Sequence, residues 1–340
     1  MTSKRLTIVG ISLAVVAVLG VGIWLWHRDA GSEAGGGTFR IGFNTWVGYG
    51  PLYVAREAGI FKKNGLNVEL IRLEGTGERR AALLSKRIEA LGSTIDDFVV
   101  GLSEGVNGKM VAVLDESRGA DGIVAKQGIR TVQDLRGKRI AVQPGFVNHF
   151  FLLYVLDKAG IGPTEFQLVP LEPDKAADAL LAGEVDVAVT WEPHLSAIKD
   201  TKGFELVLTT ADPSAQHIIF DNLVIRTDVL DDRTKDVIAL LKSWYEAIDY
   251  IKGNPEASYG ILSKAFDITS EKEVGEMMEG VYFPTPQQNL DFMAQASGAQ
   301  SIAKKVVDLY LKVDVIRTAP SVTSIKSSID PQFLRAAVSK

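Results

Sequence analysis

The chain has 340 residues, of which 46% are hydrophobic and 23% charged, and its 42 acidic and 37 basic side chains give a net charge of −5. Ordinary domains contain about 100–200 residues, so the chain has room for two globular lobes, and a mildly acidic chain has no electrostatic reason to bind nucleic acid. Because the sequence contains no cysteine, it excludes disulfides, iron–sulfur clusters, thiolate zinc sites, a cysteine nucleophile and a lipid-modified cysteine.

The amino terminus predicts a membrane-targeting helix. Two basic residues precede Leu6–Trp26, an apolar run of 21 residues, which as a helix is about 30 Å long, the thickness of a bilayer core. The positive-inside rule then places everything after Trp26 outside the cytoplasm, in the periplasm or on the outer face of the cell membrane. The run is long for a signal peptide. Cleavage after Ala30 would place Arg28 at position −3, where signal peptides have a small residue, and this favours an uncleaved signal anchor over a cleaved signal. Residues 29–37 predict a flexible linker.

From Thr38 onward, short β-rich runs alternate with helical patterns, which predicts an α/β fold of parallel sheets covered by helices. The first unit is expected to contain strands at 39–43, 67–71, 90–93 and 109–114 and helices at 51–63, 77–86 and 97–104.

A second unit of the same kind follows. Its expected strands are 123–126, 139–142, 167–171 and 185–189, its helices are 132–135, 147–159 and 175–182, and strand 223–226 then leads into a mostly helical tail that includes 234–252 and 302–311. The chain is expected to cross between two lobes near Asp121 and again near Phe220. The first lobe would comprise 38–121 plus 222–340 and the second 122–221. Ligands of open α/β sheets bind beyond the carboxyl ends of the strands, which predicts a ligand cleft between the lobes.

Several segments of the exported part carry a family resemblance. The stretch from Trp46 to Phe61 (WVGYGPLYVAREAGIF) and the following GLNVEL at 65–70 resemble the opening of substrate-binding proteins of the nitrate/sulfonate/taurine ABC importers. Four further segments match in order: GADGIVA at 119–125, DLRGK at 134–138, VDVAVTWEP at 185–193 and DNLVI at 221–225. Together they span most of the chain after the linker.

The resemblance implies a type II periplasmic-binding-protein fold, in which two lobes close on a solute by hinge motion. It also implies a binding protein rather than an enzyme, with no cofactor. Its partners would be a small-molecule solute, an ABC permease and the cytoplasmic ATPase of that permease, and the membrane through the amino-terminal helix if this is uncleaved. Relatives are similar to binders of nitrate, bicarbonate, sulfonates, taurine, urea-like compounds and pyrimidines, so the resemblance does not name the ligand.

Candidate ligand residues of the first lobe follow two predicted strands and occupy one glycine-rich loop. Trp46 and Tyr49 lie in that loop, where no amphipathic pattern requires them, and can stack on a planar or cationic ligand or simply pack on the other lobe. Asp96 is either a ligand acceptor or part of a helix amino-terminal cap. Asp115, at the end of the strand 109–114, is placed in the same way.

Candidates of the second lobe lie at one glycine turn and one strand end. The turn at Gly145 opens a helix whose backbone N–H groups favour anions, and Phe146, Asn148 and His149 follow it, although Asn148 can equally be only a cap. Trp191 and Glu192 end the strand 185–190, as ligand contacts or as a structural strand end. Asp221, at the second crossing, is either a ligand carboxylate or a hinge residue.

Aromatic side chains together with four carboxylates favour a solute with an amine, amidine or guanidinium group, or a zwitterion, and no cleft Arg or Lys is identified from the sequence. The alternative is an anionic solute of the sulfonate or nitrate type. An enzyme of the same fold is the remaining alternative, which no HExxH, GxSxG or P-loop motif supports. The spacing of His149, His194 and His217 matches no zinc signature, so no metal ion is expected.

Overall fold

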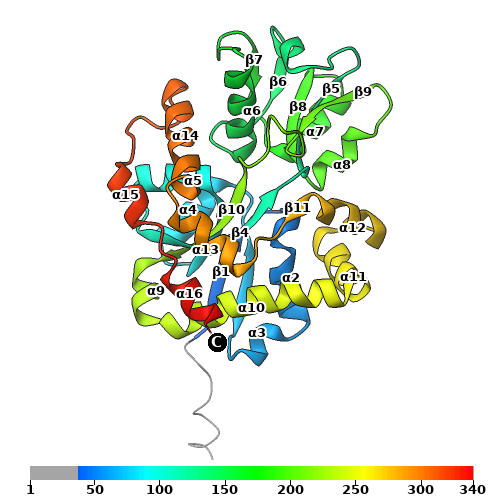
Figure 1. Ribbon diagram of the computed structural model, residues 1–340. Coiled ribbons are helices and arrows are strands. Elements are labelled where there is room, and N and C mark those ends of the chain that lie inside the picture. Colours follow the sequence, from blue (N-terminus) through cyan, green and yellow to red (C-terminus); the bar gives the residue numbers. More distant parts are fainter. Residues whose placement is uncertain (1–36, 340) are drawn as a thin grey trace, which may run out of the picture. The chain divides into compact units, whose positions relative to one another are not determined.

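The computed structural model describes residues 37–339 and contains two β-sheets. A six-stranded sheet has the order β11-β4-β10-β3-β1-β2, and a five-stranded sheet has the order β7-β6-β8-β5-β9. Figure 1 shows the five-stranded sheet with α6, α7 and α8 above the six-stranded sheet and most of the remaining helices. The predicted α/β fold with two lobes is confirmed.

The lower lobe is built around the larger sheet. Its strands are β1 (Phe39–Phe43), β2 (Val68–Arg72), β3 (Ala90–Thr94), β4 (Gly108–Ser117), β10 (Phe220–Arg226) and β11 (Val281–Tyr282). Its helices are η1 (Val47–Tyr49), α2 (Gly50–Glu57), α3 (Ile60–Lys63), α4 (Thr76–Leu84), α5 (Ile95–Ser103), α9 (Thr227–Asp232), α10 (Thr234–Gly253), α11 (Pro255–Phe266), α12 (Glu271–Glu279), α13 (Pro286–Ala294), α15 (Val322–Ser327) and α16 (Gln332–Val338).

The upper lobe is built around the smaller sheet. Its strands are β5 (Asp121–Lys126), β6 (Arg139–Ala141), β7 (Gln167–Val169), β8 (Val187–Trp191) and β9 (Phe204–Thr209), and its helices are η2 (Val132–Leu135), α6 (Val147–Lys158), α7 (Pro173–Leu181) and α8 (His194–Lys199). Helix α14 (Ala299–Lys312) packs against both α5 and α6, so it contacts both lobes. The strand expected at 185–189 lies two residues later, and β9 and β11 were not predicted.

The expectation of parallel sheets is correct for only part of each sheet. Strands β2, β1 and β3 are parallel to one another, as are β7, β6 and β8, but β10 runs antiparallel to β3 and β4, and β5 runs antiparallel to β8 and β9. Strands β5 and β10 each follow a crossing between the lobes. They enter their sheets from the cleft side, where the carboxyl ends of the parallel strands lie. Strands β5 and β10 must therefore run in the opposite direction.

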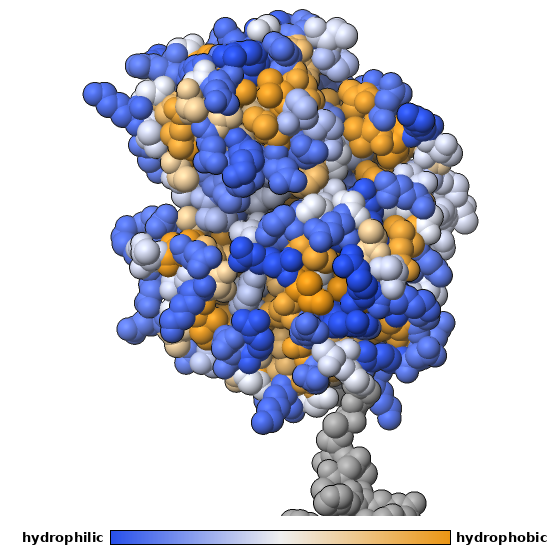
Figure 2. Space-filling model, turned by 180° about the vertical axis from the view of Figure 1, so that it is seen from behind, coloured by the Kyte–Doolittle hydropathy of each residue, from blue (hydrophilic) through white to orange (hydrophobic). Residues whose placement is uncertain are grey.

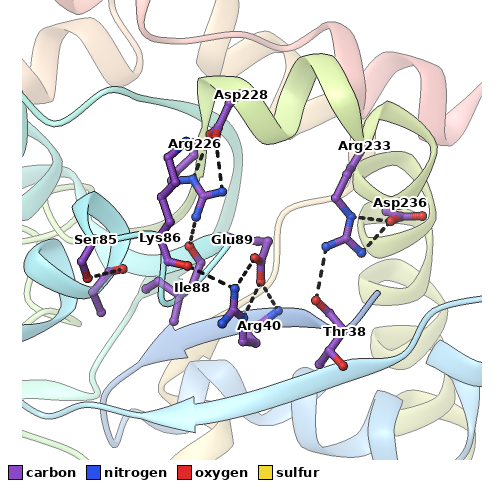
Figure 3. A network of polar contacts seen from close by, with 11 residues as sticks. Thr38, Arg40, Ser85, Lys86, Ile88, Glu89, Arg226, Asp228, Arg233 and Asp236 are labelled. Carbon is purple, nitrogen blue, oxygen red and sulfur yellow. Dashed lines mark hydrogen bonds and ion pairs between the residues drawn. The ribbon is translucent and has the colours of Figure 1, made fainter. Parts of the chain in front are cut away.

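The end of the lower sheet away from the cleft is held by ion pairs (Figure 3). Arg40 donates from Nη2 to Glu89 Oε1 at 2.7 Å, and Arg226 donates from Nη1 to the carbonyl of Ile88 at 2.7 Å and from Nε to Asp228 at 2.9 Å. These bonds join the start of β1, the chain before β3 and the end of β10, and thereby fix the register of the strands whose other ends reach the cleft.

Seen from behind, the molecule narrows between the upper and lower parts, and apolar side chains form only scattered patches (Figure 2). The predicted helix at Leu6–Trp26 and most of the linker lie outside the described residues. Within residues 37–339, no helix combines the length and the apolar character needed to cross a bilayer.

Candidate functional site

A cavity lies where the two sheets meet, and both lobes line it. Its walls are formed by Asn44, Trp46, Tyr49, Thr76, Arg79, Ser93, Thr94, Asp121, Phe146, Val147, Trp191, Ile219 and Asp221. The cavity measures about 20 Å³, which is room for a water molecule but not for a larger solute. A solute can therefore enter only when the lobes separate and the walls rearrange, which is the hinge motion expected of this architecture.

The lower wall contains two aromatic side chains bonded to two buried carboxyls. The loop after β1 becomes the short helix η1, with Trp46 immediately before it and Tyr49 at its end. Tyr49 donates from its hydroxyl to Asp221 Oδ1 at 2.5 Å, and Trp46 donates from Nε1 to Asp115 Oδ1 at 3.2 Å. Asp115 and Asp221 face each other across β4 and β10.

Gly48 makes this arrangement possible. A Cβ at this position would overlap both Trp46 Nε1 and Asp115 Oδ2. The absence of a side chain therefore allows the indole of Trp46 to reach the carboxyl of Asp115 across η1.

The upper wall is formed where β5 begins and β8 ends, and Asp121 pairs with Trp191 in that register. Trp191 donates from Nε1 to the carbonyl of Thr45 at 3.0 Å, a bond that joins the two lobes. Both carboxylate oxygens of Asp121 are buried and accept no hydrogen bond from the described part of the chain. The nearest hydroxyl that affects Asp121 is that of Ser117, which is bonded to Thr210 instead, so Asp121 lies on the wall of the cavity without a donor in hydrogen-bond geometry among the described residues.

Arg79 is the cation of this cavity that sequence analysis did not identify. It lies in α4 and is only 4% exposed. Its Nη1 donates to the carbonyls of Leu73 and Glu74, and its Nη2 lies 3.9 Å from Asp97 Oδ2. Its Nε–H is buried and has no acceptor among the described residues. The cavity thus has one unpaired donor as well as the unpaired acceptors of Asp121.

Burial raises the pKa values of the carboxyls around the cavity. The pKa of Asp121 rises to about 7 because of burial, and Glu192 and Asp96 reinforce the rise, whereas the Ser117 hydroxyl opposes it. Burial also raises the pKa values of Asp115 and Asp221 well above their ordinary range, and their mutual repulsion adds to the rise for Asp221. A cation placed among these carboxyls would favour their ionised forms.

Ten residues were expected at the site, and the structure places five of them on the cavity wall: Trp46, Tyr49, Phe146, Trp191 and Asp221. The other five lie behind it. Asp115 accepts from Trp46, and Asp96 Oδ2 accepts from the hydroxyl of Tyr310 at 3.0 Å. Both are fully buried, and neither lines the cavity.

Asn148, His149 and Glu192 make structural bonds. Asn148 donates from Nδ2 to the carbonyl of Val189 at 2.9 Å, which ties α6 to β8. His149 accepts from the Gly145 N–H at 3.3 Å, and burial lowers its pKa to about 4, so its ring is neutral. Glu192 accepts from Ser196 N at 2.9 Å, from Ser196 Oγ at 2.8 Å and from Lys199 Nζ at 3.1 Å. Ligand contact by these residues stays a prediction.

Among the residues that sequence analysis did not select, Asp121 and Arg79 matter most. Asp121 was identified only as a crossing point, although its position opposite the end of another strand could have suggested a site. Arg79 lies on a helix among other charged residues and gives no comparable signal. Within residues 37–339, His, Asp and Glu side chains form no group of three or more that could hold a metal ion.

Comparisons with known proteins agree with this architecture. The chain is 26% identical over 217 residues to a binding protein of Brucella abortus, a match that covers 62% of this chain and 66%, just under two thirds, of that protein. It is 28% identical over 247 residues to the taurine-binding periplasmic protein of Escherichia coli, covering 70% of this chain and 76% of that protein.

The crystal structure of the periplasmic aliphatic sulphonate binding protein of Escherichia coli superposes with a TM-score of 0.73 at 20% identity, over 86% of this chain and 91% of that one. This likeness confirms the two-lobed periplasmic-binding-protein fold, and the relatives confirm the resemblance to sulfonate- and taurine-binding proteins. The model of the NMT1-like family matches residues 34–262. The chain belongs to the NMT1-like family.

Proposed function

We propose that this protein is the extracytoplasmic solute-binding subunit of an ABC importer. It captures a small polar solute between its lobes, performs no chemistry on it, and delivers it to a permease driven by a cytoplasmic ATPase. Two observations support this proposal: both lobes line one cavity, and relatives are named as binding proteins for taurine and sulfonates. The lobes proposed are 38–121 plus 222–340 and 122–221, and the predicted amino-terminal helix would tether the protein to the outer face of the membrane.

The solute carries a cationic group, such as an amine, amidine or guanidinium. The observation that carries this proposal is Asp121, whose two buried oxygens accept no hydrogen bond from residues 37–339 although they lie at the cavity wall. A buried carboxylate without a partner is costly, and a charge-assisted hydrogen bond from the solute removes that cost. Asp221 lies on the same cavity, and the rings of Trp46 and Trp191 supply faces that attract a cation.

Arg79 supports an anionic solute as the second candidate. Its unpaired Nε–H can donate to a sulfonate, carboxylate or nitrate oxygen at the α4 side of the cavity. A zwitterion would use Arg79 and Asp121 together. The two candidates differ in their response to neutralisation of the carboxyls, because removing a negative charge weakens binding of a cation and strengthens binding of an anion.

The test is a thermal-shift screen of the full chain against amines, guanidines, ureas, sulfonates and inorganic anions, followed by titration of the best solute. A solute at 100 times its Kd stabilises the folded state by about 2.7 kcal/mol. We expect Asp121→Asn and Asp221→Asn to weaken a cationic solute at least tenfold, since unpairing a buried charged bond costs about 2–5 kcal/mol.

Asp186→Asn is the matched control. Asp186 binds Arg139 and Lys126 and lies outside the cavity, so its loss is expected to lower stability without changing solute affinity. Tighter binding by Asp121→Asn would establish the anionic alternative, and the absence of any hit with folded protein would refute the proposed function.

A further inference from the structure

A second, larger cavity lies in the lower lobe, outside the interlobe site. It measures about 310 Å³, within the size range of small-molecule pockets and far larger than the space between the lobes. Its lining residues come from β4, β10, β11, α13, α14 and the loops next to them, and Figure 1 shows β4, β10 and α13 in the lower part of the molecule. None of its lining residues belongs to the interlobe cavity.

The floor and walls of this second cavity are apolar. Phe220 and Phe292 pack with their ring centroids 4.4 Å apart at 33°, and Val113, Pro284 and Ile302 complete the apolar surface. Such a surface favours a ring or a branched alkyl group, because burying apolar area releases about 25 cal/mol per Å².

The rim carries polar groups at one side. Glu116 is buried and accepts from Arg118 Nη2 at 2.7 Å, and its other oxygen lies 2.6 Å from His217 Nδ1, so its charge is already paired. The guanidinium carbon of Arg118 lies 3.5 Å from the centroid of the Tyr282 ring, which holds the cation at the opening.

Two donors of this rim remain available. Arg118 uses its Nε and Nη2 on Glu116, while its Nη1 makes no hydrogen bond with the described residues. Gln288 accepts through Oε1 from Tyr282 and from Thr285 N, and its Nε2 amide likewise has no acceptor in residues 37–339. Two free donors beside an apolar floor, one of them on the guanidinium that also pairs with Glu116, match a ligand with an anionic head and an apolar tail.

We propose that this second cavity binds a small amphipathic anion, a carboxylate or sulfonate with a phenyl-sized apolar group. The apolar group lies on Phe220 and Phe292, and the anionic head accepts hydrogen bonds from Arg118 and Gln288. Arg118 follows β4 just before the first crossing, and His217 precedes β10 at the second crossing, so the ligand lies beside both connections between the lobes.

The test uses phenylacetate as the probe, with phenethylamine and benzyl alcohol as the cationic and neutral molecules of similar shape. Calorimetric titration of the full chain should show phenylacetate binding with a Kd on the order of 1 mM or tighter, and at least tenfold weaker binding of the other two. Arg118→Gln should weaken phenylacetate at least tenfold, and Arg118→Lys should restore part of the affinity, since it returns the charge without the planar donor array.

Ser297→Trp should also abolish the binding, because Ser297 is exposed at the rim and a larger side chain there fills the cavity. Ser327→Trp, an exposed position on α15 outside the cavity, is the matched control. Asp121→Asn should leave phenylacetate binding unchanged, which separates this site from the interlobe site. Absence of phenylacetate binding, binding that survives Ser297→Trp, or binding that becomes tighter or weaker in Asp121→Asn would overturn the proposal.

Discussion

The hydroxyl of Tyr310 contacts both lobes and gives the sharpest test of how they close. It lies 3.0 Å from Asp96 Oδ2 in α5 and 3.1 Å from the carbonyl oxygen of Phe146, immediately before α6. Tyr310→Phe removes this hydroxyl while keeping the ring, which stacks on His149 with centroids 6.0 Å apart and packs edge-on against Phe150. The hydroxyl has one proton, which it shares between these two acceptors, and the substitution isolates the contribution of this shared hydrogen bond.

Loss of the contact to each acceptor should affect a different measurement. The Phe146 carbonyl also accepts from His149 N and Phe150 N within α6, so it keeps partners when the hydroxyl is lost. We expect its contact with the Tyr310 hydroxyl to break when the lobes separate, so that losing it, at about 0.5–1.5 kcal/mol, weakens solute binding about 2- to 12-fold. Asp96 has no partner at Oδ1, and losing the Tyr310 hydroxyl removes the side-chain donor of its buried Oδ2, at a cost of about 1–3 kcal/mol in the free energy of unfolding.

Solute titration and urea unfolding of the same variant separate these effects. Tyr154→Phe is the control, because its hydroxyl accepts only from the side chain of Lys158 on the outer face of α6. We expect it to change neither the Kd nor the free energy of unfolding by a measurable amount. If Tyr310→Phe lowers stability but leaves the Kd unchanged, the hydroxyl does not hold the lobes together, and the reasoning fails.

Two further predictions concern the carboxyls of the interlobe cavity. Gly48→Ala should weaken solute binding at least tenfold, because the new methyl group displaces the Trp46 indole from Asp115, and titration of the folded variant checks it. The pKa of Asp121 in the folded protein, about 7, lies above its ordinary value of 3.8. The stability contributed by the protonated carboxyl of Asp121 is therefore fully present below about pH 4 and is lost as the pH rises through 7. Asp121→Asn should therefore stabilise the solute-free protein at pH 8 by up to about 4 kcal/mol, and equal or lower stability than the parent chain in urea unfolding at pH 8 would contradict this.

The sequence predicts the elements whose hydrophobic pattern is regular. The expected strand at 39–43 and the expected helix at 234–252 match β1 and α10 to within one residue. The short edge strand β11 has only two residues and no pattern to detect. The antiparallel direction of β5 and β10 also escapes local analysis, because it follows from the two crossings between lobes rather than from the residues of either strand.

The same distinction applies to the site. Trp46, Tyr49 and Trp191 were identified because aromatic residues at loops and strand ends have no role in a helical pattern. Glu192 was selected on the same positional argument, yet Ser196 and Lys199 one or two turns further along α8 occupy its carboxylate. Partners of this kind depend on side-chain geometry that residue order does not reveal.

The arrangement of charges in the interlobe cavity follows from the topology. Strands β3, β4 and β8 end at the cleft while β5 and β10 begin there, so Asp115, Asp121 and Asp221 meet although they lie far apart in the sequence. Arg79 lines the cavity from α4, where Asp97 and two carbonyls engage its Nη groups and its Nε has no acceptor among the described residues. Because the carboxyls belong to the strand ends and the guanidinium to a covering helix, a zwitterionic solute would have its cationic end fixed toward β5 and β10 and its anionic end toward α4.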